Sequence, residues 1–205
     1  MFRHLRTGLS LLMPTIVASD AFAVKESTST LDNLETACNG ESNANARYVA
    51  FARRADEDGF GEVASLFRAA ARAEEIHARN HGDVIRTMGA TPARNLETIE
   101  VKTTCENLKA AIAGEKYERD IMYPEFIEVA KRQNATAAVR TFTHALKVEA
   151  VHAVLYQHAL DNLDKRTGKS HTYYVCPDCG NTLEQLNILK CLVCGHANSG
   201  FVAVS

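Results

Sequence analysis

Residues 138–163 read AVRTFTHALKVEAVHAVLYQHALDNL, and one set of their side chains recurs at steps of three and four, as on a single helix face. That face consists of Ala138, Phe142, Ala145, Glu149, His152, Tyr156, Ala159 and Leu163. All of them suit a core except Glu149 and His152, because a buried carboxylate is costly unless a partner neutralises it. The Glu-x-x-His spacing puts both side chains next to each other, where they can bind a metal ion together.

The composition favours a helical protein of bundle size with a small additional unit. The 205 residues include 23 Lys and Arg and 25 Asp and Glu, and the net charge of −2 gives no indication of a nucleic-acid partner. Trp is absent and Pro is scarce, as expected for long helices. Four of the six cysteines fall within residues 176–194, a clustering typical of metal binding rather than of a disulfide framework.

Residues 1–23 have the pattern of an export signal. A basic start precedes an apolar segment over residues 9–18, and Ala21-Phe22-Ala23 fits a small-x-small cleavage site. The apolar segment is too short for a permanent anchor, so we expect no stable membrane span. The pattern predicts an exported, periplasmic protein, and a cytoplasmic protein with an N-terminal extension is the alternative.

Helical periodicity predicts a four-helix bundle. The expected helices cover residues 31–58, 60–88, 104–133 and 135–163. Pro124 falls inside the third of them, where we expect a kink near Tyr123. The loop over residues 90–102 reaches roughly 45 Å when extended, enough to traverse helices of roughly 40 Å. One long crossover is what an all-α, ferritin-like four-helix bundle requires.

The two helical hairpins repeat one acidic pattern. Glu41 precedes Glu74 by 33 residues and Glu115 precedes Glu149 by 34, so each hairpin carries a lone Glu followed by a Glu-x-x-His. Four carboxylates and two imidazoles cannot share a dry interior without cations, and their oxygen and nitrogen atoms suit iron or manganese. We therefore expect a di-metal site, as in ferritin-like di-iron proteins, formed by Glu41, Glu74, His77, Glu115, Glu149 and His152.

Glu118 adds a fifth carboxylate three residues after Glu115 and on the same helix face. An additional ligand suits a metal whose coordination changes with its oxidation state, because added positive charge needs added negative charge. We expect Glu118 to be such a ligand, and the alternative is a solvent-facing partner of Arg119 or Lys116.

The C-terminal residues contain two Cys-x-x-Cys-Gly turns, which begin at Cys176 and Cys191 and continue to Cys179 and Cys194. Each turn directs two thiolates at one ion, and so short a module cannot fold without its metal. Four thiolates hold either a structural zinc or a one-electron iron, and the spacing leaves both open. Iron is favoured because a redox site is expected on the same chain. The predicted units are a bundle over residues 30–165, a linker over 166–172 and a four-cysteine domain over 173–205.

Together these motifs resemble the rubrerythrin family over residues 30–205. The resemblance is carried by GESNANARY (40–48), LFRA (66–69), EEIHARNH (74–81), GEKYE (114–118), MYPEF (122–126), Glu149-x-x-His152 and the paired cysteine turns. It implies a non-haem di-iron peroxidase that reduces hydrogen peroxide to water, with a rubredoxin-like iron that passes electrons to two irons in the bundle. It also implies a homodimer in which the small domain approaches the neighbouring subunit's di-iron centre.

The resemblance further implies roles for individual residues. Glu118 and His77 would alternate as ligands of one iron, to which Glu41 and Glu74 also belong. Glu115 and His152 would belong to the other iron, and Glu74 and Glu149 would bridge the two. Tyr48 and Tyr123 match tyrosines near the family's site, where a phenol can hydrogen-bond a ligand carboxylate or peroxide; packing with an exposed hydroxyl is the alternative.

The second cysteine turn departs from the family pattern. It lacks the proline of the usual Cys-Pro-x-Cys, and His196-Ala-Asn replaces the usual tail. Two other functions therefore stay open, a ferroxidase or iron-handling protein and a non-enzymatic metal-bound bundle with a structural zinc ribbon. The electron donor is unidentified, and in a periplasm it could not be cytosolic NAD(P)H acting through a soluble reductase.

Overall fold

The computed structural model describes residues 29–165 and 167–205. The export signal predicted for residues 1–23 lies outside this range. Within the described residues, no helix combines the length and the apolar character that crossing a membrane would require.

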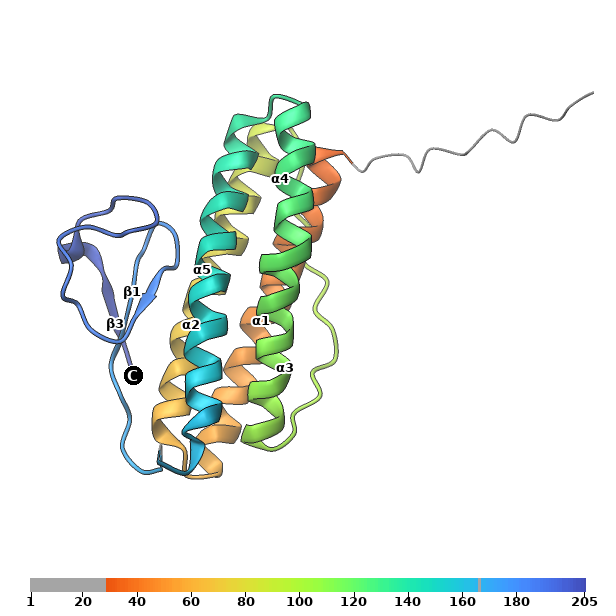
Figure 1. The fold of residues 1–205 in the computed structure, drawn as a ribbon. Coiled ribbons are helices and arrows are strands. Elements are labelled where there is room, and N and C mark those ends of the chain that lie inside the picture. Colours follow the sequence, from red (N-terminus) through yellow and green to blue (C-terminus); the bar gives the residue numbers. More distant parts are fainter. Residues whose placement is uncertain (1–28, 166) are drawn as a thin grey trace, which may run out of the picture.

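The helices form an elongated bundle with one long crossover (Figure 1). The bundle comprises α1 (Thr30–Glu57), α2 (Gly61–Thr87), α3 (Thr104–Tyr117), the π-helix η1 (Glu118–Met122), α4 (Tyr123–Arg132) and α5 (Thr136–Asp161), and the short 3-10 helix η2 (Leu163–Lys165) follows it. The segments α3, η1 and α4 follow one another without a loop and make a single rod, so the bundle has four rods. The predicted all-α, ferritin-like fold is confirmed.

Capping boxes fix where two of the rods begin. Ser29 precedes α1, and its hydroxyl accepts a hydrogen bond from the backbone N–H of Asp32 while the Asp32 carboxylate accepts one from the Ser29 N–H. Thr103 and Glu106 repeat this arrangement at the start of α3. Each box satisfies two backbone donors that the first helical turn would leave without partners.

The third rod changes its hydrogen-bond pattern before Pro124. The π-helix η1 lies where a kink near Tyr123 is expected, and the Tyr123 N–H bonds to the Glu118 carbonyl five residues earlier. Pro124 has no N–H to continue the α-helical ladder, so the local pattern can widen without losing a bond there. Glu118 begins this π-helix and Tyr123 directly follows it.

The crossover between α2 and α3 runs along the side of the bundle and is held by α1 (Figure 1). The Asn43 amide donates to the Asn95 carbonyl at 3.0 Å and accepts from the Glu97 N–H at 2.8 Å. The Asn39 side chain accepts from the Asn95 N–H at 2.7 Å. These side chains replace the secondary-structure partners that an extended loop lacks.

Two apolar clusters fill the bundle, with a polar level between them. Along α1, Cys38 belongs to one cluster and Ala44 to the other, and Glu41 lies between them in sequence. Along α5, Ala145 and Tyr156 mark the same two clusters. The hydrophobic core therefore closes off the central level of the bundle from both ends.

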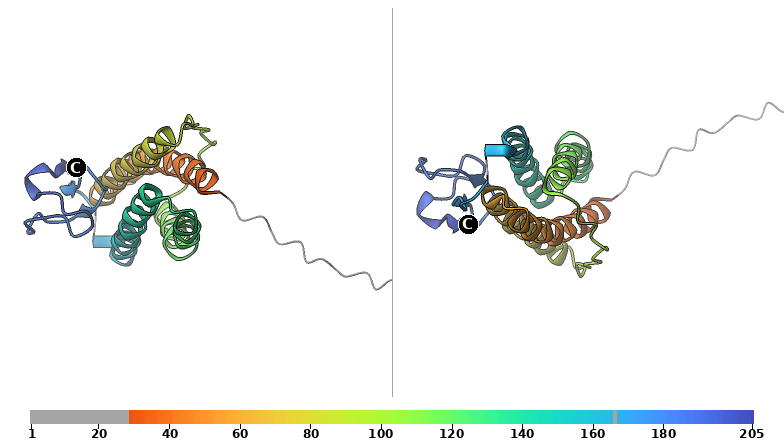
Figure 2. Two further views of the ribbon diagram at one scale, coloured as in Figure 1. Left: turned by 90° about the horizontal axis from the view of Figure 1, so that it is seen from above. Right: turned by 90° about the horizontal axis from the view of Figure 1, so that it is seen from below.

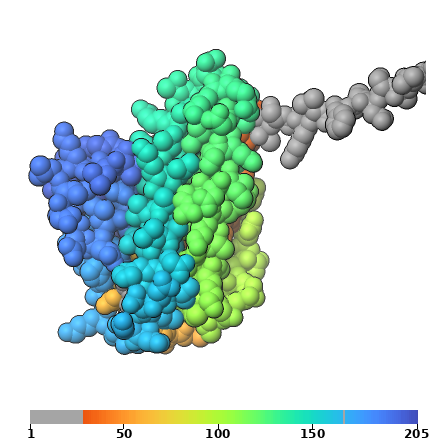
Figure 3. All heavy atoms as spheres, viewed as in Figure 1, coloured from red at the N-terminus to blue at the C-terminus, as the bar shows by residue number. Residues whose placement is uncertain are grey.

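The C-terminal residues form a small antiparallel sheet with strand order β2-β1-β3. Its elements are β1 (Tyr173–Val175), β2 (Thr182–Leu183), the 3-10 helix η3 (Asn198–Gly200) and β3 (Val202–Val204). End-on views place this domain beside α2 and α5 (Figure 2), and the space-filling view shows it as a separate lobe against the bundle (Figure 3). Tyr173 and Val175 are part of the bundle's own core, so the lobe is packed rather than merely tethered.

Replacing Asn43 with alanine tests the anchoring of the crossover. The Glu97 N–H and the Asn95 carbonyl would lose their partner, so the free energy of unfolding should fall by about 1–3 kcal/mol in urea titrations. Thr36→Ala is the matched control, because it also gives α1 a better helix former but removes only an exposed bond to the Asp32 carbonyl of the same helix. Equal losses in the two variants would show that Asn43 does not hold the loop.

Candidate metal centres

Each rod contributes to one buried polar cluster. Glu41 comes from α1, Glu74 and His77 from α2, Glu115 from α3, and Glu149 and His152 from α5. Every one of these side chains is at most 1% exposed. The structure thus brings together all six residues that the repeated pattern predicted for a di-metal site.

The cluster divides into two sets of ligand atoms that share two members. In the first set, atoms of Glu41, Glu74, His77 and Glu149 all lie within 4.8 Å of one another. In the second set, the same holds for Glu74, Glu115, Glu149 and His152. Glu74 and Glu149 belong to both sets, which is the position of bridging carboxylates between two metal ions.

The histidines present their Nδ1 atoms to the carboxylates. His77 Nδ1 lies 2.9 Å from a Glu74 oxygen and 3.0 Å from a Glu149 oxygen. His152 Nδ1 lies 3.2 Å and 3.1 Å from oxygens of the same two residues. The two Glu-x-x-His motifs therefore face each other across the bundle.

The other ring nitrogens identify the tautomer of both histidines. His77 Nε2 lies 3.0 Å from the Cys179 carbonyl, which can only accept, so Nε2 carries the proton. His152 Nε2 lies 3.1 Å from the Thr182 hydroxyl, whose own proton goes to the Gly180 carbonyl. In the neutral form, each ring therefore turns an Nδ1 lone pair toward the carboxylates. Anchoring the remote N–H in this way is the usual arrangement of a metal-binding histidine.

The carboxylates are short of partners. One oxygen on each of four residues has no hydrogen-bond partner among the described residues: Glu41 Oε2, Glu74 Oε1, Glu115 Oε2 and Glu149 Oε1. Unpaired carboxylate oxygens facing imidazole lone pairs repel one another unless protons or cations lie between them. Two divalent cations would satisfy all of these atoms at once, so the donor set fits a pair of metal ions.

Without metal, protons would have to take the place of the cations. Burial, together with Glu74 and Glu149, raises the pKa of Glu41 well above its usual range, and burial also raises the pKa of Glu115 to about 8. Burial opposes charge on His77, yet Glu149 raises the pKa of that ring. These shifts mark a site in which charges of one sign have been crowded together.

Both tyrosines singled out in the sequence reach the cluster. The Tyr48 hydroxyl donates to Glu115 Oε1 at 2.5 Å, and the Tyr123 hydroxyl donates to Glu41 Oε1. Both side chains are buried, and burial raises the pKa of each phenol, which keeps its proton. The phenols thus hydrogen-bond carboxylates of the cluster, and the alternative of an exposed hydroxyl does not apply.

Glu118 stands apart from the other carboxylates. It begins η1, is partly exposed, and belongs to neither set of mutually close ligand atoms. Burial of its carboxyl and the charges of Glu41 and Glu115 raise its pKa well above the usual range, which places it within the field of the cluster. Arg119 pairs with Asp120 at 2.6 Å, so it is bound elsewhere than at Glu118.

The four C-terminal cysteines form the second candidate centre. Ligand atoms of Cys176, Cys179, Cys191 and Cys194 lie within 4.8 Å of one another. The N–H groups of Gly180 and Gly195 bond to the carbonyls of Cys176 and Cys191 at 2.9 Å, which closes the two turns. A hydrogen bond from Cys179 lowers the pKa of Cys176 to about 5, so one thiolate is available at neutral pH for a metal.

The fold and the two centres define a ferritin-like di-iron protein with a rubredoxin-like four-cysteine domain. The family profile described as Rubrerythrin matches residues 32–160, and the chain belongs to the rubrerythrin family. Its carboxylate–histidine site and its four-cysteine site are those of that family and are consistent with iron.

Relatives match over most of the chain. Rubrerythrin-2 of Clostridium acetobutylicum is 37% identical over 85% of this chain and 96% of its own length. Nigerythrin of Nitratidesulfovibrio vulgaris is 35% identical over 85% of this chain and 86% of its own. A solved structure of mixed-valence nigerythrin superposes with a TM-score of 0.78 over 96% of this chain and 100% of that one, at 32% identity. A bacterioferritin of Desulfovibrio desulfuricans, 22% identical over 66% of this chain and 80% of its own, shares the fold with a TM-score of 0.62.

Sequence reasoning gave no role to several polar groups around the centres. His81 and Thr141 are buried and continue a hydrogen-bond chain behind Tyr123. The Cys179 carbonyl and Thr182 contact the cluster histidines from the small domain. His81 lies on the apolar helix face one turn after His77, and this position could have indicated a buried polar role. No sequence pattern indicates the contacts that the small domain makes with the cluster histidines.

Removing the metals with a chelator should destabilise the protein more at pH 8 than at pH 6. In the metal-free chain, the pKa of Glu115 is about 8 against an ordinary value of 4.5. A group whose pKa is higher in the folded than in the unfolded chain stabilises the fold fully at a pH below its unfolded-state pKa. This stabilisation is lost as the pH rises through the folded-state pKa, at up to about 1.4 kcal/mol per pH unit. The raised pKa values of Glu41 and His77 act in the same direction.

Thermal unfolding of metal-loaded and metal-free protein at the two pH values measures this difference. Glu115→Gln is the matched variant, because its metal-free form lacks the titrating carboxyl and should lose less stability between pH 6 and pH 8. A metal-free wild-type chain that is as stable at pH 8 as at pH 6 would contradict the charge crowding.

Gly180 and Gly195 allow the docking of the small domain to be tested with a built-in control. Both have positive φ values, of 80° and 83°, and occupy equivalent positions of the two turns. A Cβ on Gly180 would lie 2.8 Å from His77 Nε2 and 3.1 Å from the Ala73 Cβ, whereas one on Gly195 would meet nothing within 4 Å. Only the first glycine is required by the bundle as well as by its own turn.

Gly195→Ala should therefore cost about 1 kcal/mol from backbone strain alone. Gly180→Ala should cost a further 1–3 kcal/mol or so, because the added methyl group overpacks the contact with α2. Urea unfolding of both variants gives the comparison. The same loss in each would mean that the small domain does not need this close approach.

Proposed function

We propose that this protein is a peroxidase that reduces hydrogen peroxide to water at its di-iron centre. Electrons would reach that centre one at a time through the iron of the four-cysteine domain. The reaction consumes one peroxide, two electrons and two protons and yields two waters. The bundle and the small domain would then be two parts of one redox unit.

One contact carries this proposal, the hydrogen bond from His77 Nε2 to the Cys179 carbonyl at 3.0 Å. It joins a side chain of the carboxylate cluster directly to a residue of the four-cysteine cluster. A zinc ribbon that only stabilised the C-terminus would have no need to contact a metal-site histidine. The second contact, from His152 to Thr182, supports the same interpretation.

The ligand assignment follows the two sets of atoms. We assign Glu41 and His77 to one iron, Glu115 and His152 to the other, and Glu74 with Glu149 to both. Glu118 lies beside the cluster at the start of η1, where the π-turn gives it freedom to approach. We assign to it the role of an additional ligand that enters when the charge at the site increases.

The protein's own residues position the metal ligands, exclude bulk water from the site and hold protons beside it. When bound, an iron pair supplies the two electrons that cleave the O–O bond. The apolar clusters on either side keep bulk water out of the central level. The hydroxyls of Tyr48 and Tyr123 donate hydrogen bonds to Glu115 and Glu41, so each keeps a proton beside the carboxylate cluster.

The relatives support redox cycling of such a site. Nigerythrin, at 31–32% identity, has been solved in mixed-valence, partially reduced and all-ferrous states. These states describe that protein, and we extend the cycling to this chain because the family and the ligand types agree. A homodimer, an exported location and an outside electron donor complete the proposal.

The all-ferrous protein should be reoxidised faster by hydrogen peroxide than by an equal concentration of O₂ in stopped-flow absorption measurements. Glu149→Gln should abolish the fast phase, because it removes a carboxylate shared by both metal positions, and Glu125→Gln on the exposed side of α4 should not. Equal rates, or a faster reaction with O₂, would instead favour a ferroxidase. Zinc in the four-cysteine site of protein purified without added metal would contradict the electron supply.

A further inference from the structure

A continuous chain of hydrogen bonds crosses the bundle behind one of the two site tyrosines. Thr141 Oγ1 on α5 lies 3.1 Å from His81 Nδ1 on α2, and His81 Nε2 lies 3.1 Å from the Tyr123 hydroxyl on α4. The Tyr123 hydroxyl bonds in turn to Glu41 on α1. The side chains of His81 and Tyr123 are completely buried, so these bonds have no competition from solvent.

The donors of this chain all point the same way. The Tyr123 proton is directed at Glu41, so the Tyr123 oxygen must accept from His81, and the proton of His81 is on Nε2. His81 Nδ1 is then an acceptor, and the Thr141 hydroxyl donates to it. Burial lowers the pKa of His81 to about 3, so the ring is neutral and has one donor and one acceptor. The pattern is therefore aligned for movement of a proton toward Glu41.

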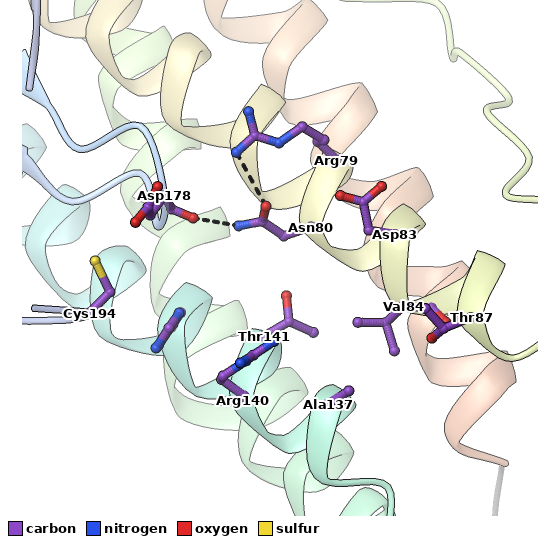
Figure 4. A pocket seen from close by; sticks show the side chains of 11 residues that line it. Arg79, Asn80, Asp83, Val84, Thr87, Ala137, Arg140, Thr141, Asp178 and Cys194 are labelled. Carbon is purple, nitrogen blue, oxygen red and sulfur yellow. Dashed lines mark hydrogen bonds between the residues drawn. The ribbon is translucent and has the colours of Figure 1, made fainter. Parts of the chain in front are cut away.

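The outer end of the chain opens into a pocket. Thr141 lines a pocket of about 630 Å³ between α2, α5 and the small domain, together with Arg79, Arg140 and Asp178 (Figure 4). Most of the side chains that line it are polar or charged, and the volume accommodates many water molecules. Thr141 thus lies where a pocket large enough for water meets the buried hydrogen bonds.

The second site tyrosine provides a contrast within the same molecule. Tyr48 donates to Glu115 as Tyr123 donates to Glu41, but the rings of Phe51, Phe67 and Tyr156 pack against Tyr48 at centroid distances of 6.3, 5.9 and 5.5 Å. The Tyr156 hydroxyl has no hydrogen-bond partner among the described residues, so these rings form no relay. Although the two hairpins repeat each other, a chain of hydrogen bonds therefore continues behind Tyr123, and aromatic rings without such a chain lie behind Tyr48.

We propose that Thr141, His81 and Tyr123 relay protons from this pocket to Glu41 and so supply one of the two protons consumed in peroxide reduction. The inference rests on the proposed peroxidase function for its role, but its geometry is independent of it. Thr141 and His81 act through Tyr123 and are positioning residues of the relay.

The Tyr123 proton moves to the Glu41 carboxylate, the His81 Nε2 proton moves to the Tyr123 oxygen, and the Thr141 proton moves to His81 Nδ1. A pocket water then replaces the Thr141 proton, so the net change is one proton carried from water to Glu41. From Glu41 the proton passes to a peroxide oxygen that leaves as water, while the electrons come from the iron pair. Rotation of the two hydroxyls restores their starting orientation, and His81 returns to its Nε2-protonated form by giving the Nδ1 proton to pocket water and taking one from water on Nε2.

Thr141→Val tests the relay, because it removes the hydroxyl and keeps the shape of the side chain. Thr141→Ser keeps a hydroxyl and should restore the relay. Thr143→Val is the matched control on the same helix, since the Thr143 hydroxyl bonds only to the Val139 carbonyl one turn earlier. Thr141→Ala is a second hydroxyl-free variant should the valine variant not fold.

The first measurement does not depend on turnover. In the full chain loaded with diamagnetic zinc, nitrogen-15 NMR reports the His81 tautomer and the exchange of its ring proton with water. The expected results are an Nε2-protonated ring and an exchange rate that falls at least about tenfold in Thr141→Val, but not in Thr141→Ser or Thr143→Val. An Nδ1-protonated ring, or equal exchange in the two valine variants, would overturn the relay.

The second measurement uses the iron-loaded protein. Reoxidation of the ferrous protein by peroxide should be slowed at least about tenfold in Thr141→Val, and its solvent deuterium isotope effect should increase, which a purely structural defect would not cause. An unchanged isotope effect would overturn the role in proton supply. If the wild-type protein shows no preference for peroxide over O₂, the proposed function fails, while the zinc-loaded measurement still decides whether the relay exists.

Discussion

The arrangement of the whole protein depends on a repulsion that the chain cannot resolve by itself. Four carboxylates lie at the centre of the bundle, and two imidazoles turn their Nδ1 lone pairs toward them. In each neutral histidine ring the proton lies on Nε2, at the hydrogen bond on the far side of the ring, so Nδ1 is free to bind a cation. Bound cations would neutralise these charges. The level of the bundle where like charges repel would then become the level at which shared metal ligands join all four rods.

The surroundings of the cluster follow from this constraint. Ligands must be held in place before the metal arrives, and each is fixed by a partner outside the cluster: Glu115 by Tyr48, Glu41 by Tyr123, and His77 by the Cys179 carbonyl. Because His77 is held by the small domain, the docking of that domain is part of the construction of the di-metal site. The close approach at Gly180 has the same origin, since only a residue without a side chain lets the turn come this near to α2.

The features that follow from helical periodicity and from the internal repeat could be predicted from the sequence. The helix faces, the two Glu-x-x-His motifs and the spacing of 33 and 34 residues predicted the bundle, and the structure brings together the six residues expected to meet in it. The π-helix could not be predicted from periodicity. Pro124 indicates that the α-helical hydrogen bonds are interrupted, but it does not indicate whether the result is a kink or a π-helix. The partners of His77 and His152 lie about 100 and 30 residues away in the chain, on a domain whose docking leaves no periodic signal. Thr141 was hidden for a similar reason, since its meaning comes only from contact with His81 across two helices.

The structure also shows how a duplicated pattern becomes two different halves. The repeat makes the ligands of the two metal positions nearly equivalent, and each position receives one tyrosine hydroxyl. The equivalence ends just outside the ligands. One histidine bonds to a backbone carbonyl and the other to a threonine hydroxyl, and Glu118 accompanies only the second hairpin. Tyr123, directly after the π-helix, is hydrogen-bonded to His81, whereas Tyr48 lies among aromatic rings. In the proposed reduction of peroxide, cleavage of the O–O bond would make unlike demands on the two ends of the site. These differences around a nearly symmetric pair of positions are where the direction of the proposed reaction can be set.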